Sequence, residues 1–189
     1  MSKYGNKLAT PEQVASLVRD GMWVDYGTVQ APRAFDRALA QRVGEVKNVK
    51  IRALGHLTPL EVMEKDPEAK SFWIGNWHIL GWTRKYIAEN RGTHIPYNFG
   101  EAARYYRDGL DVDIAVQIVT PMDKHGYFNF GPLCNFKKAV FERAKIIVVE
   151  VVEDMPWCYG GYDECIHISE VDYVIENNTD KLITIPTPQ

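Results

Sequence analysis

The chain has 189 residues, of which 46% are hydrophobic and 25% charged, and its 22 Lys+Arg against 25 Asp+Glu give a formal net charge of -3. A chain of this length buries enough apolar surface to fold without a metal or a disulfide. The balanced charge and the lack of a basic stripe exclude a protein that binds along a nucleic-acid backbone, and no apolar run reaches the ~18 residues of a membrane span.

The cysteines and the N-terminal sequence indicate a cytoplasmic protein. "MSKYGNKLATPEQ" has no apolar stretch long enough for a signal peptide, and Cys134, Cys158 and Cys165 are an odd number of thiols. Free thiols in a reducing compartment are therefore expected. The spacing of Cys158, Cys165 and His167 matches no zinc motif, so we expect no metal site and favour structural cysteines over a thiol nucleophile.

The predicted elements alternate between helix and strand along the chain. A capping pattern, "TPEQ" at 10–13, predicts a helix that ends at Gly21, and "TPLE" at 58–61 predicts a second capping box before a short helix that ends near Lys65. Apolar periodicity predicts the other elements. In chain order these are a strand at 22–27, a helix at 31–46, strands at 48–54 and 71–76, a helix at 81–90, a strand at 94–98, a helix at 101–109, a strand at 112–120, a short strand after the loop that follows, a helix at 134–144 and a strand at 145–152.

This alternation predicts an α/β fold, an open and mostly parallel sheet with helices on both faces. We expect one domain over residues 1–177. The polar and Pro-rich stretch 178–189 is interpreted as an exit linker or tail. Ligands bind at the C-terminal ends of the strands in such sheets, so the loops that follow the strands are the first places to look for a site.

The loop "YGTVQAP" at 26–32 joins a predicted strand to a predicted helix. Gly27 allows a close backbone approach, and Thr28 and Gln30 offer polar side chains beside the free N–H groups of a helix start. The stretch matches neither common nucleotide-binding motif. The local sequence alone favours an ordinary strand-to-helix turn.

A second loop, "TPMDKHGYFNFG" at 120–131, carries more polar groups than a simple connection needs. Pro121 sets the turn, Gly126 is expected at positive φ, and Asp123 and His125 are expected on the tip. Two residues at this spacing rarely hold each other in catalytic geometry, so an acid/base pair is not favoured. A role in shaping a substrate pocket stays open, with Thr120 and Tyr127 at the two ends of the turn.

The stretch "GNWHILGWTRK" lies at a predicted strand end. Trp77, His78 and Trp82 precede a basic pair, Arg84 and Lys85, an arrangement that suits an anionic or adenine-containing ligand. Packed tryptophans and solvated cations are the more common outcome for such a pattern. His78 is kept among the candidate substrate-binding residues.

Several segments together resemble one family, the acetyl-CoA hydrolase/CoA-transferase proteins, and within it the butyryl-CoA:acetate and 4-hydroxybutyrate CoA-transferases. They are "DGMWVDYGTVQAPRAFDRAL", "VKIRAL", "FWIGNWHILGWTRK", "LDVDIAVQIVTPMDKHGYFNFG" and "AKIIVVEVVEDMPWCYGGYDECIHISEVDYVIE", followed by the Pro-rich tail. The similarity runs in order from about Leu8 to Pro188. The chain departs from its relatives at Pro132 and Cys134, where small polar residues are usual, and this leaves the acyl preference open.

The resemblance implies the N-terminal half of a CoA-transferase with a sheet of the CoA-transferase type. In this family a glutamate carboxylate attacks an acyl-CoA, CoA is carried as an enzyme thioester, and a second carboxylic acid collects it. That glutamate belongs to the C-terminal half, so no catalytic residue is expected here, and Glu150, Glu153 and Glu164 are not assigned the role. The substrate-binding residues implied are Gly27, Thr28, Gln30, His78, Thr120, Pro121, Asp123, Gly126 and Tyr127.

The expected ligands and partners follow from the same resemblance. The substrates are an acyl-CoA, with coenzyme A thioester as substrate rather than cofactor, and a short-chain carboxylate. The partner is a C-terminal-type domain or subunit, and exposed apolar surface suggests a hetero- or homo-oligomer. Two other functions remain open: a non-catalytic module that binds acyl-CoA or a protein, and a stand-alone phosphosugar isomerase, for which neither a phosphate cradle nor an acid/base pair is found.

Overall fold

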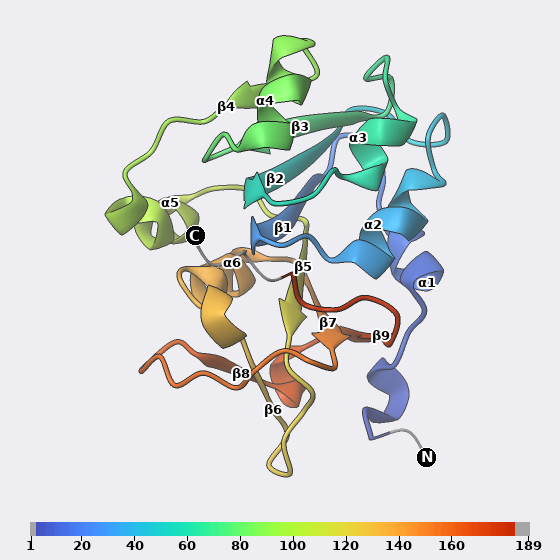
Figure 1. Ribbon diagram of the computed structural model, residues 1–189. Coiled ribbons are helices and arrows are strands. Elements are labelled where there is room, and N and C mark those ends of the chain that lie inside the picture. Colours follow the sequence, from blue (N-terminus) through green and yellow to red (C-terminus); the bar gives the residue numbers. More distant parts are fainter. Residues whose placement is uncertain (1–2, 184–189) are drawn as a thin grey trace, which may run out of the picture.

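The computed structural model describes residues 3–183 and contains a seven-stranded sheet in the order β4-β3-β2-β1-β5-β7-β9 (Figure 1). Every strand pairing in this sheet is parallel. The strands are β1 (Trp23–Val29), β2 (Val49–His56), β3 (Phe72–Asn76), β4 (Gly92–His94), β5 (Ile114–Val119), β7 (Ile146–Val152) and β9 (Tyr173–Asn177). The predicted open parallel sheet is confirmed.

Helices cover both faces of the sheet, as predicted. They are α1 (Pro11–Ala15), α2 (Arg33–Ala40), α3 (Glu61–Lys65), α4 (Gly81–Ala88), α5 (Ala102–Asp108) and α6 (Lys137–Arg143). In Figure 1, α1, α2 and α3 lie to the right of the strands, and α5 and α6 lie to the left. One hydrophobic cluster lies under α1 to α3 around Phe35, Ile51 and Ile114, and a second lies under α5 and α6 around Ala115, Val149 and Phe141.

A small antiparallel ribbon adds to the second face. It consists of β6 (Tyr127–Asn129) and β8 (Cys165–His167). Four short 3₁₀ turns complete the described structure, η1 (Gly5–Lys7), η2 (Phe99–Glu101), η3 (Gly131–Leu133) and η4 (Ile168–Glu170). Between residues 3 and 183, no helix is both long and apolar enough to cross a membrane.

The first capping prediction is confirmed and the second is wrong. The Thr10 hydroxyl accepts from Gln13 N at 3.2 Å, and the Gln13 side chain accepts from Thr10 N at 2.8 Å. Helix α3, however, begins after Leu60 without a side-chain cap from its own chain segment. The Asp36 carboxylate, from α2, accepts from Glu61 N at 2.6 Å and therefore takes the place expected of Thr58.

The predicted element lengths also need correction. Helix α1 ends at Ala15 rather than Gly21, and α2 covers only Arg33–Ala40 of the predicted 31–46. The strand expected at 94–98 ends at His94, because Pro96 has no N–H for a ladder bond. Strands β8 and β9 had no counterpart in the predicted elements.

Candidate functional site

The point where the strand order reverses lies between β1 and β5. From β1 the chain adds β2, β3 and β4 in one direction, and from β5 it adds β7 and β9 in the other. Ligands of open α/β sheets bind outside the C-terminal strand ends at such a point. The loop after β1 and the start of the loop after β5 are therefore the candidate site (Figure 1).

The end of β1 is a tight turn that a β-branched residue rarely adopts. Val29 has φ 63°, and Gln30 N donates to Thr28 O at 2.6 Å, which closes a three-residue turn. Just before it, Gly27 has φ 70°, and a methyl group there would lie 2.0 Å from Oε1 of Gln117. Backbone strain of this kind persists where the surroundings hold it, and it gathers at functional sites.

Thr28 is buried below this turn. Its hydroxyl oxygen accepts from Asn135 Nδ2 at 2.9 Å, which ties the loop to the residues just before α6. The hydroxyl keeps its own proton, so it can still donate to a ligand.

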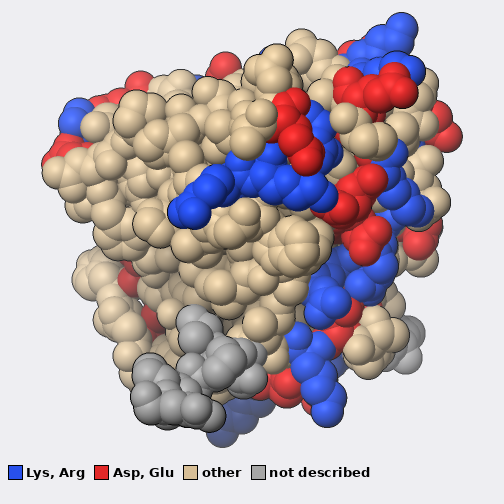
Figure 2. Space-filling model, turned by 45° about the horizontal axis from the view of Figure 1, so that its top comes forward, with Lys and Arg blue, Asp and Glu red and all other residues tan. Residues whose placement is uncertain are grey.

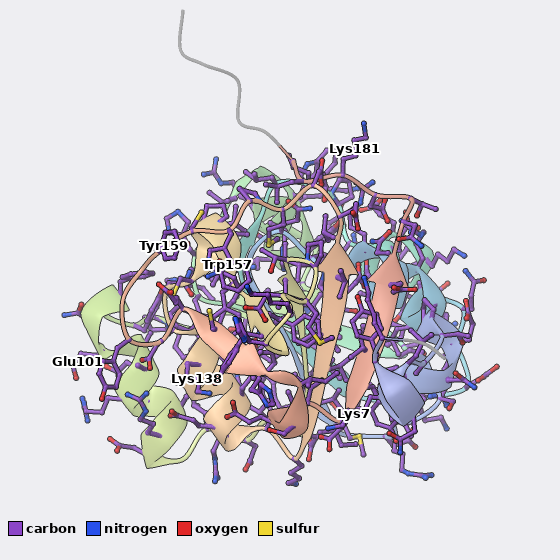
Figure 3. All side chains as sticks on the ribbon, turned by 90° about the horizontal axis from the view of Figure 1, so that it is seen from below. Lys7, Glu101, Lys138, Trp157, Tyr159 and Lys181 are labelled. Carbon is purple, nitrogen blue, oxygen red and sulfur yellow. The ribbon has the colours of Figure 1, made fainter. Side chains whose placement is uncertain are left out.

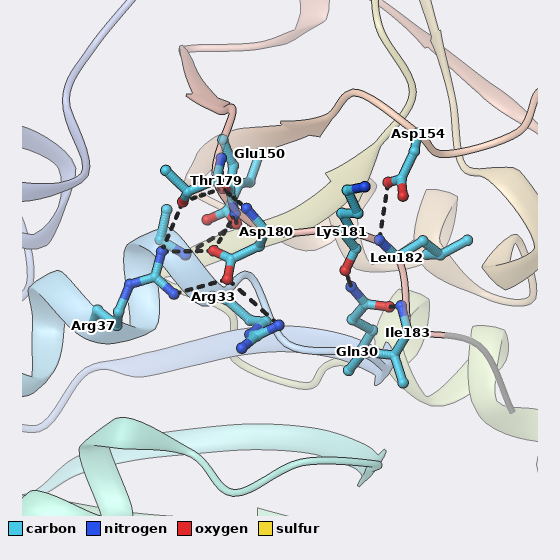
Figure 4. A network of polar contacts seen from close by, with 12 residues as sticks. Gln30, Arg33, Arg37, Glu150, Asp154, Thr179, Asp180, Lys181, Leu182 and Ile183 are labelled. Atoms are coloured by element: carbon cyan, nitrogen blue, oxygen red, sulfur yellow. Dashed lines mark hydrogen bonds and ion pairs between the residues drawn. The ribbon is translucent and has the colours of Figure 1, made fainter.

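The side chain of Gln30 is occupied within the chain itself. Its Oε1 accepts from Ile183 N at 3.0 Å, and its Nε2 donates to Lys181 O at 3.4 Å (Figure 4). Gln30 therefore fixes residues 181–183 against the loop after β1. It would contact a substrate only if these bonds were exchanged, so it remains a candidate with a competing structural role.

Residues 178–183 lie along the strand ends and are held at several points. The Asp180 carboxylate accepts from Arg37 Nη2 at 2.6 Å and from Asn177 Nδ2 at 2.9 Å, and Leu182 N donates to Asp154 at 2.9 Å (Figure 4). The domain boundary predicted at residue 177 stays a prediction, and residues 184–189 of the predicted tail lie outside the described part of the chain.

Residues 120–129 form a hairpin-like loop that runs from the end of β5 through β6, which we call the hairpin, and Thr120 closes its base. Its N donates to Asn129 O at 3.0 Å, and its hydroxyl oxygen accepts from Asn129 N at 3.0 Å. Thr120 is buried, whereas Pro121 beside it is half-buried. Of the hairpin residues predicted to bind substrate, these two lie closest along the chain to the strand ends.

The turn itself is shaped by Asp123. Its Oδ1 accepts from His125 N at 2.9 Å and from Tyr127 N at 2.8 Å, and the Tyr127 N–H is the main cause that holds the pKa of Asp123 below its usual value. Gly126, at φ 87°, accepts from Ile168 N at 2.8 Å. The Asp123 carboxylate thus builds the turn.

The structure places this turn away from the loop after β1. Figure 1 shows the turn before β6 at the bottom of the view, while β1 ends near the middle. The ring of Tyr127 packs against His167, with centroids 4.8 Å apart. Asp123, Gly126 and Tyr127 are therefore not brought together with Gly27 and Thr28 within one chain.

His78 lies in a pocket at the ends of the first four strands. This pocket has a volume of about 500 Å³ and is lined by Val29, Leu54, Trp77, His78, Leu80, His94, Tyr97 and Phe99. The rings of Trp77 and Tyr97 are 4.6 Å apart and form its aromatic wall. Tyr97 and Phe99 are not predicted at this pocket, because the apolar pattern of "HIPYN" indicates a strand. Pro96 is the signal of an irregular segment that could have shown otherwise.

Glu150 is engaged as a helix cap. It lies on β7, fully buried, and accepts from Ala34 N at 3.1 Å, from Phe35 N at 2.9 Å and from Asn177 Nδ2 at 2.7 Å. Burial raises its pKa, which these three donors oppose. A carboxylate with its oxygens directed into the start of α2 has a structural role.

Asp25 is also a buried carboxylate with three hydrogen-bond donors, and it lies on the face of the sheet that α5 covers. Its carboxylate accepts from the Tyr106 hydroxyl at 2.6 Å, from Gly27 N at 2.9 Å and from Gln117 Nε2 at 3.3 Å. Burial raises its pKa, and the positive charge of Arg52 opposes the shift. This network fixes β1 to its neighbours just before the Val29 turn.

The cysteines and acidic residues form no metal site in the described residues. All three thiols are free, and no group of three or more His, Cys, Asp and Glu side chains between residues 3 and 183 could hold an ion. Burial raises the pKa of Cys134 and of Cys165, which disfavours reactive thiolates.

Comparison with known proteins identifies the chain's relatives. The family model described as acetyl-CoA hydrolase/transferase N-terminal domain matches residues 1–186. The chain is 42% identical to the butyryl-CoA:acetate CoA-transferase of Anaerostipes caccae over 92% of this chain and 40% of that one. It is 41% identical to the probable butyrate:acetyl-CoA coenzyme A-transferase of Syntrophomonas wolfei, over 98% of this chain and 42% of that one.

A solved structure has the same fold over nearly the whole of this chain. The crystal structure of RipA from Yersinia pestis superimposes with a TM-score of 0.85 at 27% identity, over 98% of this chain and 45% of that one. The chain thus spans about 40% of the length of the curated relatives it matches.

Proposed function

Because the chain belongs to the acetyl-CoA hydrolase/transferase family through its N-terminal domain, we propose that it is half of a CoA-transferase. The complete enzyme moves CoA between an acyl-CoA, such as butyryl-CoA, and a short carboxylic acid such as acetate. The observation that carries the proposal is the 42% identity to a butyryl-CoA:acetate CoA-transferase over 92% of this chain.

The reaction needs a carboxylate nucleophile that this half does not offer. The carboxylate attacks the thioester carbonyl and releases CoA as a thiolate; the thiolate then attacks the resulting anhydride, which leaves an enzyme thioester and the free first acid. A second acid reverses both steps. Two buried carboxylates on the strands, Asp25 and Glu150, have their oxygens engaged by three donors each, which supports a nucleophile supplied by a C-terminal-type domain or subunit.

Residues of this chain form one wall of the cleft. Gly27 and Thr28 bring the loop after β1 to the acyl group, and Thr120 and Pro121 border it from the end of β5. The aromatic pocket around His78 lies beside them. An apolar wall excludes water from the enzyme thioester and so favours transfer over hydrolysis. Asp123, Gly126 and Tyr127 would reach substrate only where the turn faces the site of another chain in an assembly.

We infer a cytoplasmic enzyme without a resident cofactor. Free Cys134, Cys158 and Cys165 fit a reducing compartment. Acyl-CoA and the short acid are its small-molecule ligands.

The test is an exchange assay on the assembly that contains this chain. With butyryl-CoA and acetate, separation of the CoA esters should show acetyl-CoA and butyrate forming in equal amounts, and this chain alone should show none. If the chain alone binds butyryl-CoA while its assembly never exchanges the acids, the chain is a binding module instead.

A further inference from the structure

The loop between β7 and β8 exposes two aromatic rings to water. Residues 156–162, "PWCYGGY", contain no charged side chain. Tyr159 is 90% exposed and Tyr162 is 104% exposed, the highest values among the large hydrophobic side chains described. Exposed aromatic side chains are enriched at protein interfaces.

The backbone of this loop is held in place. The side chain of Asn129 accepts from Cys158 N at 3.0 Å and donates to Cys158 O at 2.9 Å. The N–H groups of Gly160 and Gly161 both donate to the Glu164 carboxylate. A loop that is already ordered loses little entropy when it binds, so its exposed rings are available as anchors.

The loop lies on the side of the molecule where the strands end. Figure 3 shows Tyr159 and Trp157 in the upper half of the view together with Lys181, and β7 and β9 point in that direction, whereas Lys7 lies at the opposite side. Figure 2 shows a broad uncharged area on the left half of the surface, bordered by mixed charges on the right. Phe99, 58% exposed, adds a further apolar side chain at the pocket of His78.

We propose that Tyr159 and Tyr162 are the anchors of a docking surface for the C-terminal-type domain; this rests on the proposed function. The family model describes an N-terminal domain, and about 60% of the length of the Anaerostipes caccae and Syntrophomonas wolfei relatives lies outside the match, which is room for a further domain. The held segment 178–183 leads along the same edge. A loop without cations offers nothing to an anionic membrane or a nucleic acid.

The area that the two tyrosines can bury is a large share of one side of a stable interface. A stable interface buries about 800 Å² on each partner, and a tyrosine contributes about 150–250 Å² when it is buried. Two tyrosines therefore supply roughly half of one side. The partner surface should be apolar where it receives the two rings.

The test is hydroxyl-radical footprinting of this chain alone and in its assembly with the C-terminal-type domain. The oxidation rates of Tyr159 and Tyr162 should fall by at least ~5-fold in the assembly, while that of Trp82, 42% exposed on α4, stays the same. In the assembly, the double variant Y159S/Y162S should weaken association by at least ~10-fold, and Y159F/Y162F should not. A matched W82S variant should have no effect.

Equal oxidation of both tyrosines in the two samples would overturn the proposal. So would protection that appears in this chain alone and grows with its concentration, because the surface would then bind a second copy. These readouts do not use activity. An assembly that protects the tyrosines but never exchanges acids would leave the docking surface standing and refute the transferase.

Discussion

Lys137, the first residue of α6, has its ammonium group buried where β5 ends. Nζ donates to Ile118 O at 3.0 Å, and burial lowers its pKa from 10.5 to about 7. Between these two values the unfolded chain binds more protons than the folded chain, so this residue makes the free energy of unfolding rise with pH from about 7 to about 10.5. Below about 7 the folded chain carries the full cost of a buried charge.

Replacing this lysine should therefore stabilise the fold near neutral pH. We expect Lys137→Met to raise the free energy of unfolding by about 1–2 kcal/mol at pH ~6, with the gain shrinking toward pH ~10. Urea unfolding at several pH values measures it. Lys138→Met, one residue along the chain and paired with Glu170 at 2.9 Å, is the control and should give a difference without this trend. A gain for Lys137→Met that is the same at every pH would contradict the assignment.

Glu150 supports the start of α2 through its buried carboxylate. Glu150→Ala leaves the N–H groups of Ala34 and Phe35 and the Asn177 amide without their acceptor, so we expect a loss of about 2–4 kcal/mol in stability. Glu153→Ala, on the exposed residue just past β7, should change stability by less than about 0.5 kcal/mol. Thermal unfolding compares the two. An unchanged midpoint for Glu150→Ala would show that the carboxylate does not support α2.

The end of β1 depends on a position that only glycine can fill without strain. Gly27→Ala combines a strained φ of 70° with a methyl group 2.0 Å from Gln117 Oε1, and we expect a loss of about 2–3 kcal/mol. Gly161→Ala, at φ 94° with nothing within 4 Å, isolates the backbone effect and should cost only about 1 kcal/mol.

The part of the Gly27→Ala stability loss that comes from the short contact with Gln117 can be tested separately. Adding Gln117→Ala to Gly27→Ala should restore part of the stability, because the short contact is removed. Strict additivity of the two changes in chemical unfolding would show that the side chains do not meet at the end of β1.

Elements with a strong local signal could be predicted from the sequence. The apolar runs of β5 and β7 and the capping box of α1 formed as expected, because their own residues supply the burial and the bonds. The start of α3 could not be predicted. Its N–H groups are satisfied by Asp36, a residue 25 positions earlier, which only the folded chain brings near.

Short strands escaped prediction for the same reason. β8 has three residues, and its partner is β6, which comes 36 or more positions earlier at each paired residue. β9 depends on its parallel register with β7. Such segments gain their stability from a neighbouring strand rather than from their own pattern.

The sequence analysis located the two candidate loops but not which of their residues lie close together in the folded chain. Both loops follow strands that meet at the reversal point, and the family resemblance predicted the right fold and class of protein. The sequence could not show that the hairpin carries Asp123 and Tyr127 away from Thr28. Nor could it show that Gln30 binds residues 181–183, because both follow from contacts between distant segments.

We propose that this chain shapes an acyl-transfer site whose nucleophile is supplied from outside it. Intact-mass analysis of the assembly incubated with butyryl-CoA, quenched in acid and mapped by proteolysis, tests this most directly. The CoA adduct should appear on a glutamate beyond residue 189 or on a second subunit, and peptides of residues 1–189 should stay unmodified. An adduct on Glu150, Glu153 or Glu164 would contradict the claim and place the catalytic group in this half.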